Sequence, residues 1–349
     1  YGDERKTELL DSVEEIDIED LIEEEDNVFT LTHFGYIKRL PTSTYRSQNR
    51  GGRGISALST REEDFVETLF TASTHDNILF FTTRGRMYHL KGYQIPEAGR
   101  HAKGTAIINL LPIEQDEKVT AMLAVRDYEE DTSLIMATKR GTVKKTSISD
   151  FNMTRKGGLI AIGLNEDDDL IDVRIVGKND TVILSTYKGM AIRFNEDDAR
   201  AMGRTAHGVR GIRLREDDYV IGMEIAKEGA ELLVVTEGGF GKKTDLSEYK
   251  IQTRGGVGIK TYKITEQTGN IVGIKTVGEN IDLMVITSEG VIIRMNTADI
   301  STIGRSTKGV RLVKLGDGVK VASIALTEHE EEKEESEEPE KTESPEENA

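Results

Sequence analysis

The 349-residue chain has no cysteine, no tryptophan and only five prolines. Without cysteine it cannot build a disulfide framework, a thiolate zinc or iron–sulfur site, or a thiol nucleophile. No run approaches the roughly 18 apolar residues of a membrane-spanning helix, and no signal-peptide core is present. The first residue is Tyr1, which indicates a piece of a longer protein. What remains is a glycine-rich, charged chain, with 34 glycines, 63 acidic residues and 46 basic residues.

The negative charge is concentrated at the two ends of the chain. The formal net charge is −17, of which residues 1–26 carry −11 (13 acids, two bases) and residues 328–349 carry −10 (12 acids, two bases). Subtraction leaves +4 for residues 27–327. We expect 1–26 to be an acidic leader and 328–349 a disordered tail, because the tail has too few apolar residues to offset the entropy of ordering. The tail is either a solubility device or a regulatory polyanion.

One unit recurs six times between these ends. Each copy opens with an apolar run, a turn ending in glycine and a second run, as in NILFFTTRGRMYHL, which is a hairpin signal. A loop that closes on glycine and a third run follow, and a fourth run ends the copy. The acidic turns before the fourth run fit solvated turns better than calcium loops. The turn glycines stand 48 to 56 residues apart, at Gly35, Gly85, Gly141, Gly189, Gly239 and Gly290.

Four strands in about 50 residues, six times over, predict an all-β fold: a propeller-like ring of six four-stranded blades. Neighbouring blades then bury the faces that one blade leaves exposed. Alternation of Ile16 and Ile18 in the leader suggests a strand that completes the last blade. The pattern leaves open whether the ring is flat or spiral. The expected blades are residues 27–73, 74–126, 127–176, 177–226, 227–277 and 278–327.

Basic residues recur at fixed places in the repeat. Four residues after the turn glycines stand Arg39, His89, Lys145, Arg193, Lys243 and Arg294. Two to four residues before the loop glycines stand Arg50, Arg100, Arg155, Arg204, Arg254 and Arg305. Nearby cations are Lys38, Arg46, Arg53, Arg86, Lys103, Lys144, Lys156, Lys242 and Lys308. Because repeats place equivalent residues at equal radius, we expect two basic bands that fit a nucleic-acid backbone. Aromatic residues are not interleaved, which favours duplex over single-stranded partners.

The sequence shows no catalytic constellation. The glycine-rich loop RGGRG lacks the spacing of a phosphate-binding loop, the six histidines lack metal-ligand spacing, and no G-x-S-x-G elbow is present. We therefore expect no catalytic residue, no metal ligand and no enzymatic activity in this piece of chain.

The loop Gln48, Asn49, Arg50, Gly51, Gly52, Arg53, Gly54 resembles the seven-residue GyrA box, Q-[RK]-R-G-G-[RK]-G, of DNA gyrase A subunits. Asn49 replaces a basic residue of that motif. YGDERKTE resembles the stretch where the subunit's coiled-coil arm hands over to its C-terminal domain, and EEDNVFTLTHFGYIKRL resembles the first strands of that domain. The chain is thus similar, over residues 1–327, to the C-terminal DNA-wrapping domain of bacterial gyrase A subunits.

The resemblance implies a six-bladed β-pinwheel in which neighbouring blades exchange a strand. It implies that the basic rim wraps double-stranded DNA into a positive crossing, and that the box is needed for the wrap. The parent complex is then an A2B2 assembly of B subunits with complete A subunits. Such a complex is an ATP-dependent type II topoisomerase that introduces negative supercoils in the bacterial cytoplasm, at the nucleoid. Magnesium and ATP serve that complex, and no cofactor is expected for this domain.

Alternatives from other classes remain at this point. The topoisomerase IV A subunit shares the repeat architecture but lacks an intact box. A propeller that serves as a protein-interaction platform, kelch-like in its repeat length, fits the period but not the basic registers. An enzyme with its site in the central channel would need catalytic residues that the motifs do not supply.

Overall fold

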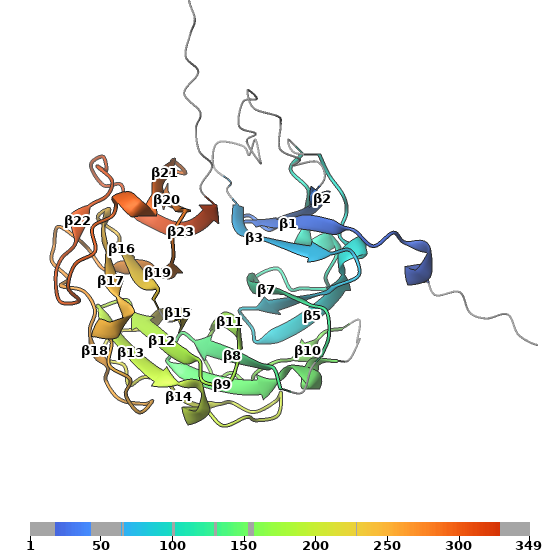
Figure 1. Cartoon of the computed structure of the whole chain (residues 1–349), viewed down its shortest axis with the longest axis horizontal. Helices are drawn as coiled ribbons and strands as arrows, with labels where there is room; N and C mark the ends of the chain where they lie inside the picture. The colour runs from blue at the N-terminus through green and yellow to red at the C-terminus, as the bar shows by residue number, and fades with distance from the viewer. Residues whose placement is uncertain are drawn as a thin grey trace, which may run out of the picture.

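The computed structural model describes residues 18–42, 64, 66–99, 102–128, 131–152, 157–227 and 229–328. Within them the fold is all-β, six antiparallel sheets that follow one another around a ring in chain order, as Figure 1 shows. No helix in these ranges is long and apolar enough to cross a membrane. The predicted fold class, a six-bladed β-pinwheel, is confirmed.

Each blade is built on a hairpin that turns at a glycine. The turn glycines have φ between +70° and +89°, a region in which other residues are strained. Their N–H groups donate to the carbonyl of a threonine three residues earlier, at 2.8 to 3.1 Å. The hairpins are β1 (Asp26–Thr32) with β2 (Tyr36–Pro41), β4 (Asn77–Thr82) with β5 (Arg86–Lys91), β8 (Ser133–Thr138) with β9 (Thr142–Ser147), β12 (Thr181–Thr186) with β13 (Met190–Asn195), β16 (Glu231–Thr236) with β17 (Phe240–Asp245), and β20 (Ile281–Thr287) with β21 (Ile292–Asn296).

The last strand of each repeat pairs with the first strand of its hairpin and lies toward the centre of the ring (Figure 1). Each of these pairs carries a register shift near the turn end of the hairpin, for example between Ser185 and Thr186. The inner strands are β3 (Val66–Ser73), β7 (Val119–Val125), β11 (Leu170–Val176), β15 (Val220–Ala226), β19 (Ile271–Val277) and β23 (Val321–Glu328).

A two-residue strand from the following repeat completes the outer edge of the first five blades. The first sheet runs β3-β1-β2-β6, so its fourth strand comes from the second repeat. The exchanged strands are β6 (Thr105–Ala106), β10 (Leu159–Ile160), β14 (Val209–Arg210), β18 (Ile259–Lys260) and β22 (Val310–Arg311). This exchange agrees with the resemblance. The sixth sheet holds three strands in the described part of the chain, and the equivalent segment of the first repeat lies in residues 43–63, outside it.

Short 3₁₀ helices connect these strands. They are η1 (Ile18–Leu21), η3 (Gly92–Gln94), η4 (Ile107–Asn109), η5 (Ile148–Phe151), η6 (Glu196–Asp198), η7 (Leu246–Glu248) and η8 (Thr297–Asp299). Ile18 thus begins a 3₁₀ turn, whereas Ile16 and residues 329–349 lie outside the described residues.

The leader residues that are described lie against the second blade. The Lys91 ammonium is 2.9 Å from the Glu19 carboxylate, and Arg126 pairs with Glu24. A ring nitrogen of His75 lies 2.9 Å from the carbonyl oxygen of Ile22. The described part of the leader, from residue 18 on, is therefore bound to side chains of the second repeat.

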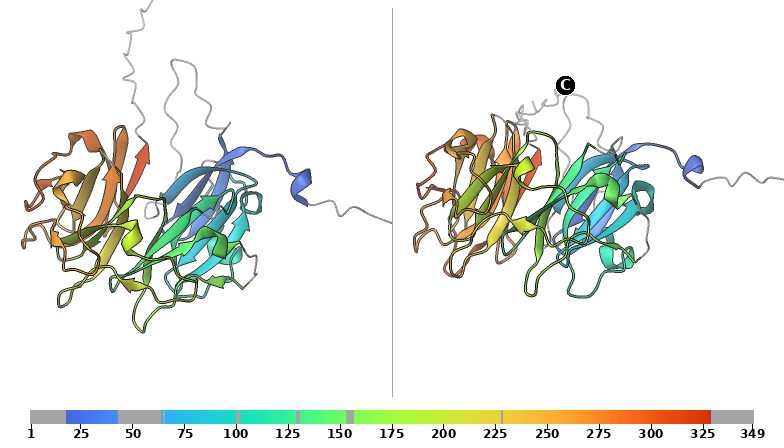
Figure 2. Two further views of the ribbon diagram at one scale, coloured as in Figure 1. Left: turned by 60° about the horizontal axis from the view of Figure 1, so that its bottom comes forward. Right: turned by 90° about the horizontal axis from the view of Figure 1, so that it is seen from below.

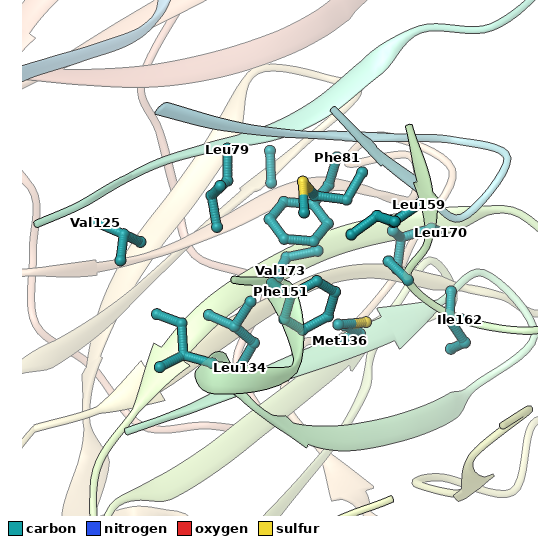
Figure 3. Close-up of a cluster of buried hydrophobic side chains, with 14 residues drawn as sticks. Leu79, Phe81, Val125, Leu134, Met136, Phe151, Leu159, Ile162, Leu170 and Val173 are labelled. Atoms are coloured by element: carbon teal, nitrogen blue, oxygen red, sulfur yellow. The ribbon is translucent and has the colours of Figure 1, made fainter. Parts of the chain in front are cut away.

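The hydrophobic core lies between blades rather than within one. Figure 3 shows the cluster between the second and third, where Phe81 and Phe151 meet edge to face with ring centroids 5.9 Å apart. Exchanged-strand residue Leu159 packs into the same cluster. Four further clusters of this kind join the first to second, third to fourth, fourth to fifth and fifth to sixth blades. The ring is thus a chain of blades in which each is stabilised by its neighbours. In both views of Figure 2 the last repeats (orange to red) lie on the left of the ring and the first repeat (blue) on the right.

Candidate nucleic-acid interface

The basic loops run along the outer rim and hydrogen-bond to one another. In repeats 2 to 6 the chain leaves the hairpin, passes through its loop and enters the exchanged strand of the preceding blade. The N–H of Gly163 donates to Ala206 (3.0 Å), that of Arg213 to Gly256 (2.7 Å), and that of Lys263 to Thr307 (3.0 Å). The loops of repeats 3 to 6 therefore form one continuous ridge along the rim.

Glycine lets these loops approach the preceding blade closely. Gly208 has φ +93°, and a Cβ atom there would lie 2.5 Å from the carbonyl oxygen of Val143. Gly258 has φ +69°, and its Cβ would lie 2.3 Å from the carbonyl oxygen of Ala191. A side chain at either position would push the loop outward, so these glycines determine how closely the loops approach the preceding blade.

Six exposed cations on this ridge are not among those predicted from the sequence. The second residue of three exchanged strands and the residue three positions later are all exposed: Arg210, Arg213, Lys260, Lys263, Arg311 and Lys314. The signal is present as VRGIR, IKTYK and VRLVK in repeats 4 to 6. Repeats 2 and 3 carry Ala106 with Asn109 and Ile160 with Gly163 at these places. Within the described residues, these six exposed cations therefore form one arc on blades 3 to 5, to which the three strands pair.

Several of the predicted cations donate hydrogen bonds to backbone carbonyls of a neighbouring repeat. Arg254 donates from Nε to the carbonyl of Asp198 (2.6 Å) and from a terminal nitrogen to that of Arg210 (2.9 Å). Arg305 reaches the carbonyl of Lys260 in the same way, and Arg86 reaches that of Gly157. These guanidinium groups, like that of Arg204, are half-buried. The bonds of Arg254, Arg305 and Arg86 join neighbouring repeats, and these side chains leave part of their surface to solvent.

Two predicted loop lysines are exposed. Lys308 stands before its loop glycine, as does Lys103, whose ammonium lies 3.6 Å from the ring centroid of Tyr36. This cation–π contact orients Lys103 without neutralising its charge. Both ammonium groups remain available to an anion.

The cations four residues after the turn glycines do not form an open band. Five of the six bond to a polar side chain at the start of the hairpin's first strand: Arg39 to Asn27 (2.9 Å), His89 to Asn77 (2.7 Å), Arg193 to Thr181 (2.9 Å), Lys243 to Glu231 (2.8 Å) and Arg294 to Asp282 (2.7 Å). The sixth, Lys145, is buried and pairs with Glu196. Burial lowers the pKa of His89 and of Arg193. The cations at this position therefore mainly bind protein groups of the blades.

Three further predicted contacts, Lys38, Lys144 and Lys242, are buried, with exposed fractions of 2%, 0% and 0%. Burial lowers the pKa of Lys38, and it lowers those of Lys144 and Lys242 to about 8. Side chains in these places have no surface to offer a phosphate group. Of the predicted DNA contacts, the whole box Gln48–Gly54 and Arg46, Arg100, Arg155 and Lys156 lie outside the described residues.

The inner strands carry charges that pair with one another. In the channel, Arg174 on β11 lies 3.1 Å from Asp172 and 3.0 Å from Glu224 on β15, and Lys275 on β19 lies 3.6 Å from Glu224. Burial raises the pKa of Glu224. This network joins blades 3, 4 and 5, the blades that carry the basic arc.

A cavity of about 630 Å³ opens where the inner strands begin. Tyr187 and Tyr219 stack there with ring centroids 4.7 Å apart, and Tyr187 donates to Glu237 (3.1 Å). The lining includes no histidine. Across the described ranges no three His, Asp or Glu side chains are grouped so as to hold a metal ion.

A ring of six blades, completed by strands exchanged between successive repeats and edged with cations, defines a β-pinwheel. The family model for the DNA gyrase C-terminal domain, beta-propeller, matches all six repeats, and the chain belongs to this family. The resemblance drawn from the box and the leader is confirmed. The matched residues are 26–73, 76–126, 132–177, 180–227, 230–277 and 282–328.

Relatives of known name agree with this assignment. The chain is 53% identical over 336 residues to the DNA gyrase A subunit of Staphylococcus epidermidis, and 50% identical over 336 residues to that of Staphylococcus aureus. Each alignment covers 95% of this chain but 38% of the relative, so the chain spans well under half of these subunits.

Two solved structures share the fold. The C-terminal domain of DNA topoisomerase IV superposes with a TM-score of 0.77 at 25% identity, covering 88% of this chain and 94% of that one. A DNA gyrase A C-terminal domain superposes with a TM-score of 0.68 at 27% identity, covering 86% and 99%. The fold is therefore common to both kinds of topoisomerase, whereas the sequence relatives are gyrase subunits.

Proposed function

We propose that this domain binds duplex DNA along its outer rim and bends it into a positive crossing. The observation that supports this most is the basic arc: six exposed cations recur at two fixed positions on adjacent loops that hydrogen-bond to each other. Cations at a regular spacing neutralise successive phosphates without reading bases. In this proposal the box Gln48–Gly54, whose sequence holds two arginines and three glycines, contacts the same DNA.

In this proposal the domain itself is not catalytic. It presents the crossing to the rest of an A2B2 complex, in which strand passage powered by ATP turns the positive crossing into negative supercoils. The partners are double-stranded DNA, the B subunit, which supplies the ATP site, and the remainder of the A subunit, in the bacterial cytoplasm. Magnesium and ATP act on those other parts.

A topology experiment tests the proposal. A plasmid is relaxed by a topoisomerase I in the presence of the domain, and the sign of the retained linking difference is read on a gel. We expect positive superhelicity that grows with the ratio of domain to DNA. Retention of no linking difference, at concentrations where a mobility assay shows full binding, would contradict wrapping and leave simple binding.

The box provides the matched variant. Alanine at residues 48–54 should leave plain binding largely intact, because the arc on blades 3 to 5 remains. It should abolish the trapped crossing, since bending duplex DNA over a few helical turns costs several kcal/mol and needs its last contact to close. Loss of binding together with normal bending in the residual complex would contradict this division of labour.

A further inference from the structure

One position of the hairpin lies directly beneath the basic loop of the following repeat. It is the third residue after the turn glycine. A Cβ atom on Gly208 would lie 3.0 Å from the Cβ of Lys144, one on Gly158 would lie 2.7 Å from the ring of Tyr88, and one on Gly256 would lie 3.7 Å from Ile192. The residue type alternates around the ring, with Lys38, Lys144 and Lys242 in blades 1, 3 and 5 and Tyr88, Ile192 and Ile293 in blades 2, 4 and 6.

Each of the three lysines donates to carbonyl groups of the loop above it. Lys38 Nζ lies 3.0 Å from the carbonyl oxygen of Gly99 and 3.1 Å from that of Ala102. Lys144 Nζ donates to the carbonyl of Arg204 in the loop above it, and also to the carbonyl of Ala161, which belongs to its own repeat. These bonds join residues 61 to 64 positions apart for Lys38 and 60 apart for Lys144 with Arg204.

Lys242 repeats the arrangement in the fifth blade. Its Nζ lies 2.8 Å from the carbonyl oxygen of Gly304, 2.5 Å from that of Arg305 and 3.2 Å from the hydroxyl of Thr307. The Tyr262 ring centroid is 5.2 Å away. Three blades thus use a buried ammonium group to gather the inward-facing carbonyls of the next loop.

The opposite side of each loop faces solvent. Lys103, His207 and Lys308, which precede the loop glycines, are exposed. An ammonium group offers several donors and no acceptor, so it can collect carbonyls that no strand pairs. With these carbonyls bound from inside, the outward side of each loop presents the exposed side chain that precedes its glycine.

We infer that Lys38, Lys144 and Lys242 are positioning residues for the rim, and that they bind the loops from inside rather than touching DNA. The inference rests on the proposed function, because it assigns these loops to DNA contact. It differs from a direct phosphate contact in what their removal does to the salt dependence of binding.

The test compares Lys144→Met and Lys242→Met with wild type in the full chain. Two measurements are made: amide hydrogen exchange in residues 203–208 and 304–309, and affinity for a labelled duplex over a series of salt concentrations. Lys139→Met is the matched control, since Lys139 lies on the same hairpin as Lys144 and its side chain is 46% exposed toward solvent. Residues 253–258, beneath which lies Ile192, are the internal control.

We expect exchange to rise at least about tenfold in the loop above the substituted lysine, because hydrogen bonds to a charged group are lost, and to stay constant in 253–258. Duplex affinity should weaken roughly three- to tenfold, while the slope of log affinity against log salt stays the same, because no phosphate contact is lost. The control should change neither measurement.

Two results would overturn the inference. A slope shallower by about one, with unchanged exchange in the loop, would mean direct phosphate contact. A lower melting temperature with unchanged duplex affinity would mean a role in stability alone. Absence of binding by the wild-type chain would instead remove the proposed function, while the exchange data would still report whether the loops are anchored.

If a methionine variant does not fold, the wild-type chain still decides the point. Ammonium protons of Lys144 and Lys242 bonded to carbonyls should exchange slowly enough at neutral pH to be seen in ¹⁵N-labelled protein. Ammonium signals that exchange as fast as those of the exposed Lys139 would contradict the inference.

Discussion

The hairpins and the rim of this ring carry similar numbers of basic residues and use them in opposite ways. On the hairpins, Arg193 bonds to Thr181 within its own blade, and Lys145 pairs with Glu196 of the next repeat. These cations therefore bind other protein groups. On the rim, Arg210 and Lys260 are exposed and lie on exchanged strands whose adjoining loops are joined by backbone hydrogen bonds. Recurrence of a cation in a repeat therefore shows that it takes the same place in each blade, and does not show whether that place faces solvent or other protein groups.

The largest effect is expected when a buried cation of a hairpin is replaced by a neutral residue. Lys145→Met should lower the free energy of unfolding by about 3–5 kcal/mol, because it leaves the Glu196 carboxylate buried without its partner. Urea unfolding measures the loss. The double variant with Glu196→Gln should recover part of it, and a loss below about 1 kcal/mol would show that the pair is not important to the blade.

The converse variant removes rim cations. Arg210→Ala, Lys260→Ala and Arg311→Ala together should reduce the slope of log affinity against log salt by about three, since each contacts one phosphate. Unfolding should change by less than about 1 kcal/mol, because the side chains are exposed. An equal-charge control, Lys139→Ala, Lys178→Ala and Lys227→Ala, lies off the loops. A slope reduced as much by the control would contradict the arc.

The buried lysines of the hairpins should make the stability of the fold depend on pH, which exposed rim cations should not. Their folded pKa of about 8 lies below the unfolded value near 10.5, so between these pH values the unfolded chain binds more protons than the folded chain. The free energy of unfolding should therefore rise with pH from 8 toward 10.5, by roughly 1–3 kcal/mol per lysine. The free energy of unfolding is measured against pH for wild type and for Lys144→Met. The rise should be smaller in the variant, and the contribution of tyrosine titration, which is common to both chains, cancels in the difference. Parallel curves would contradict the shift.

The smallest effect concerns the acidic tail. Truncation after Thr327 removes −10 from a chain whose body carries +4. If the tail competes for the rim, duplex affinity should rise about threefold at low salt and by less at high salt, because both interactions are screened. Titration of one labelled duplex against intact and truncated chains at two salt concentrations measures this. Equal affinities at low salt would leave the tail as a solubility device.

The fold could be predicted because its signals are local. Each turn glycine, such as Gly85, stands between two β-branched or aromatic runs, and a period near 50 residues sets the number of blades. The exchange of strands could not be predicted from the residues alone, because Leu159 and Ile160 carry no mark of pairing with a hairpin that ends 68 residues earlier, at Lys91. It entered only through the family resemblance.

The sequence predicted cations on the rim, but only some of the residues that the structure exposes there, and their contact with DNA stays a proposal. Lysine at the third position after the turn glycine looks the same in the sequence whether its amine faces phosphate or backbone carbonyls. Burial decides between these, and burial depends on the loop of the next repeat. Arg210, Lys260 and Arg311 were overlooked because their motif is confined to half of the repeats. The box lies outside the described residues and stays a prediction.

The exchanged strands have a consequence for how this chain is made. Because the outer edge of each of the first five blades comes from the following repeat, a nascent blade has an open edge until about 70 further residues have left the ribosome, as the separation of Lys38 from the loop at Ala102 illustrates. During translation from the N-terminus, the newest blade thus always lacks its outer strand. The repeat that supplies this strand also forms the next blade, which then lacks its own. An exposed strand edge invites pairing with other chains. A ribosome that stalls within a loop would hold that edge open, so pauses should be least tolerated between a turn glycine and the loop glycine that follows it.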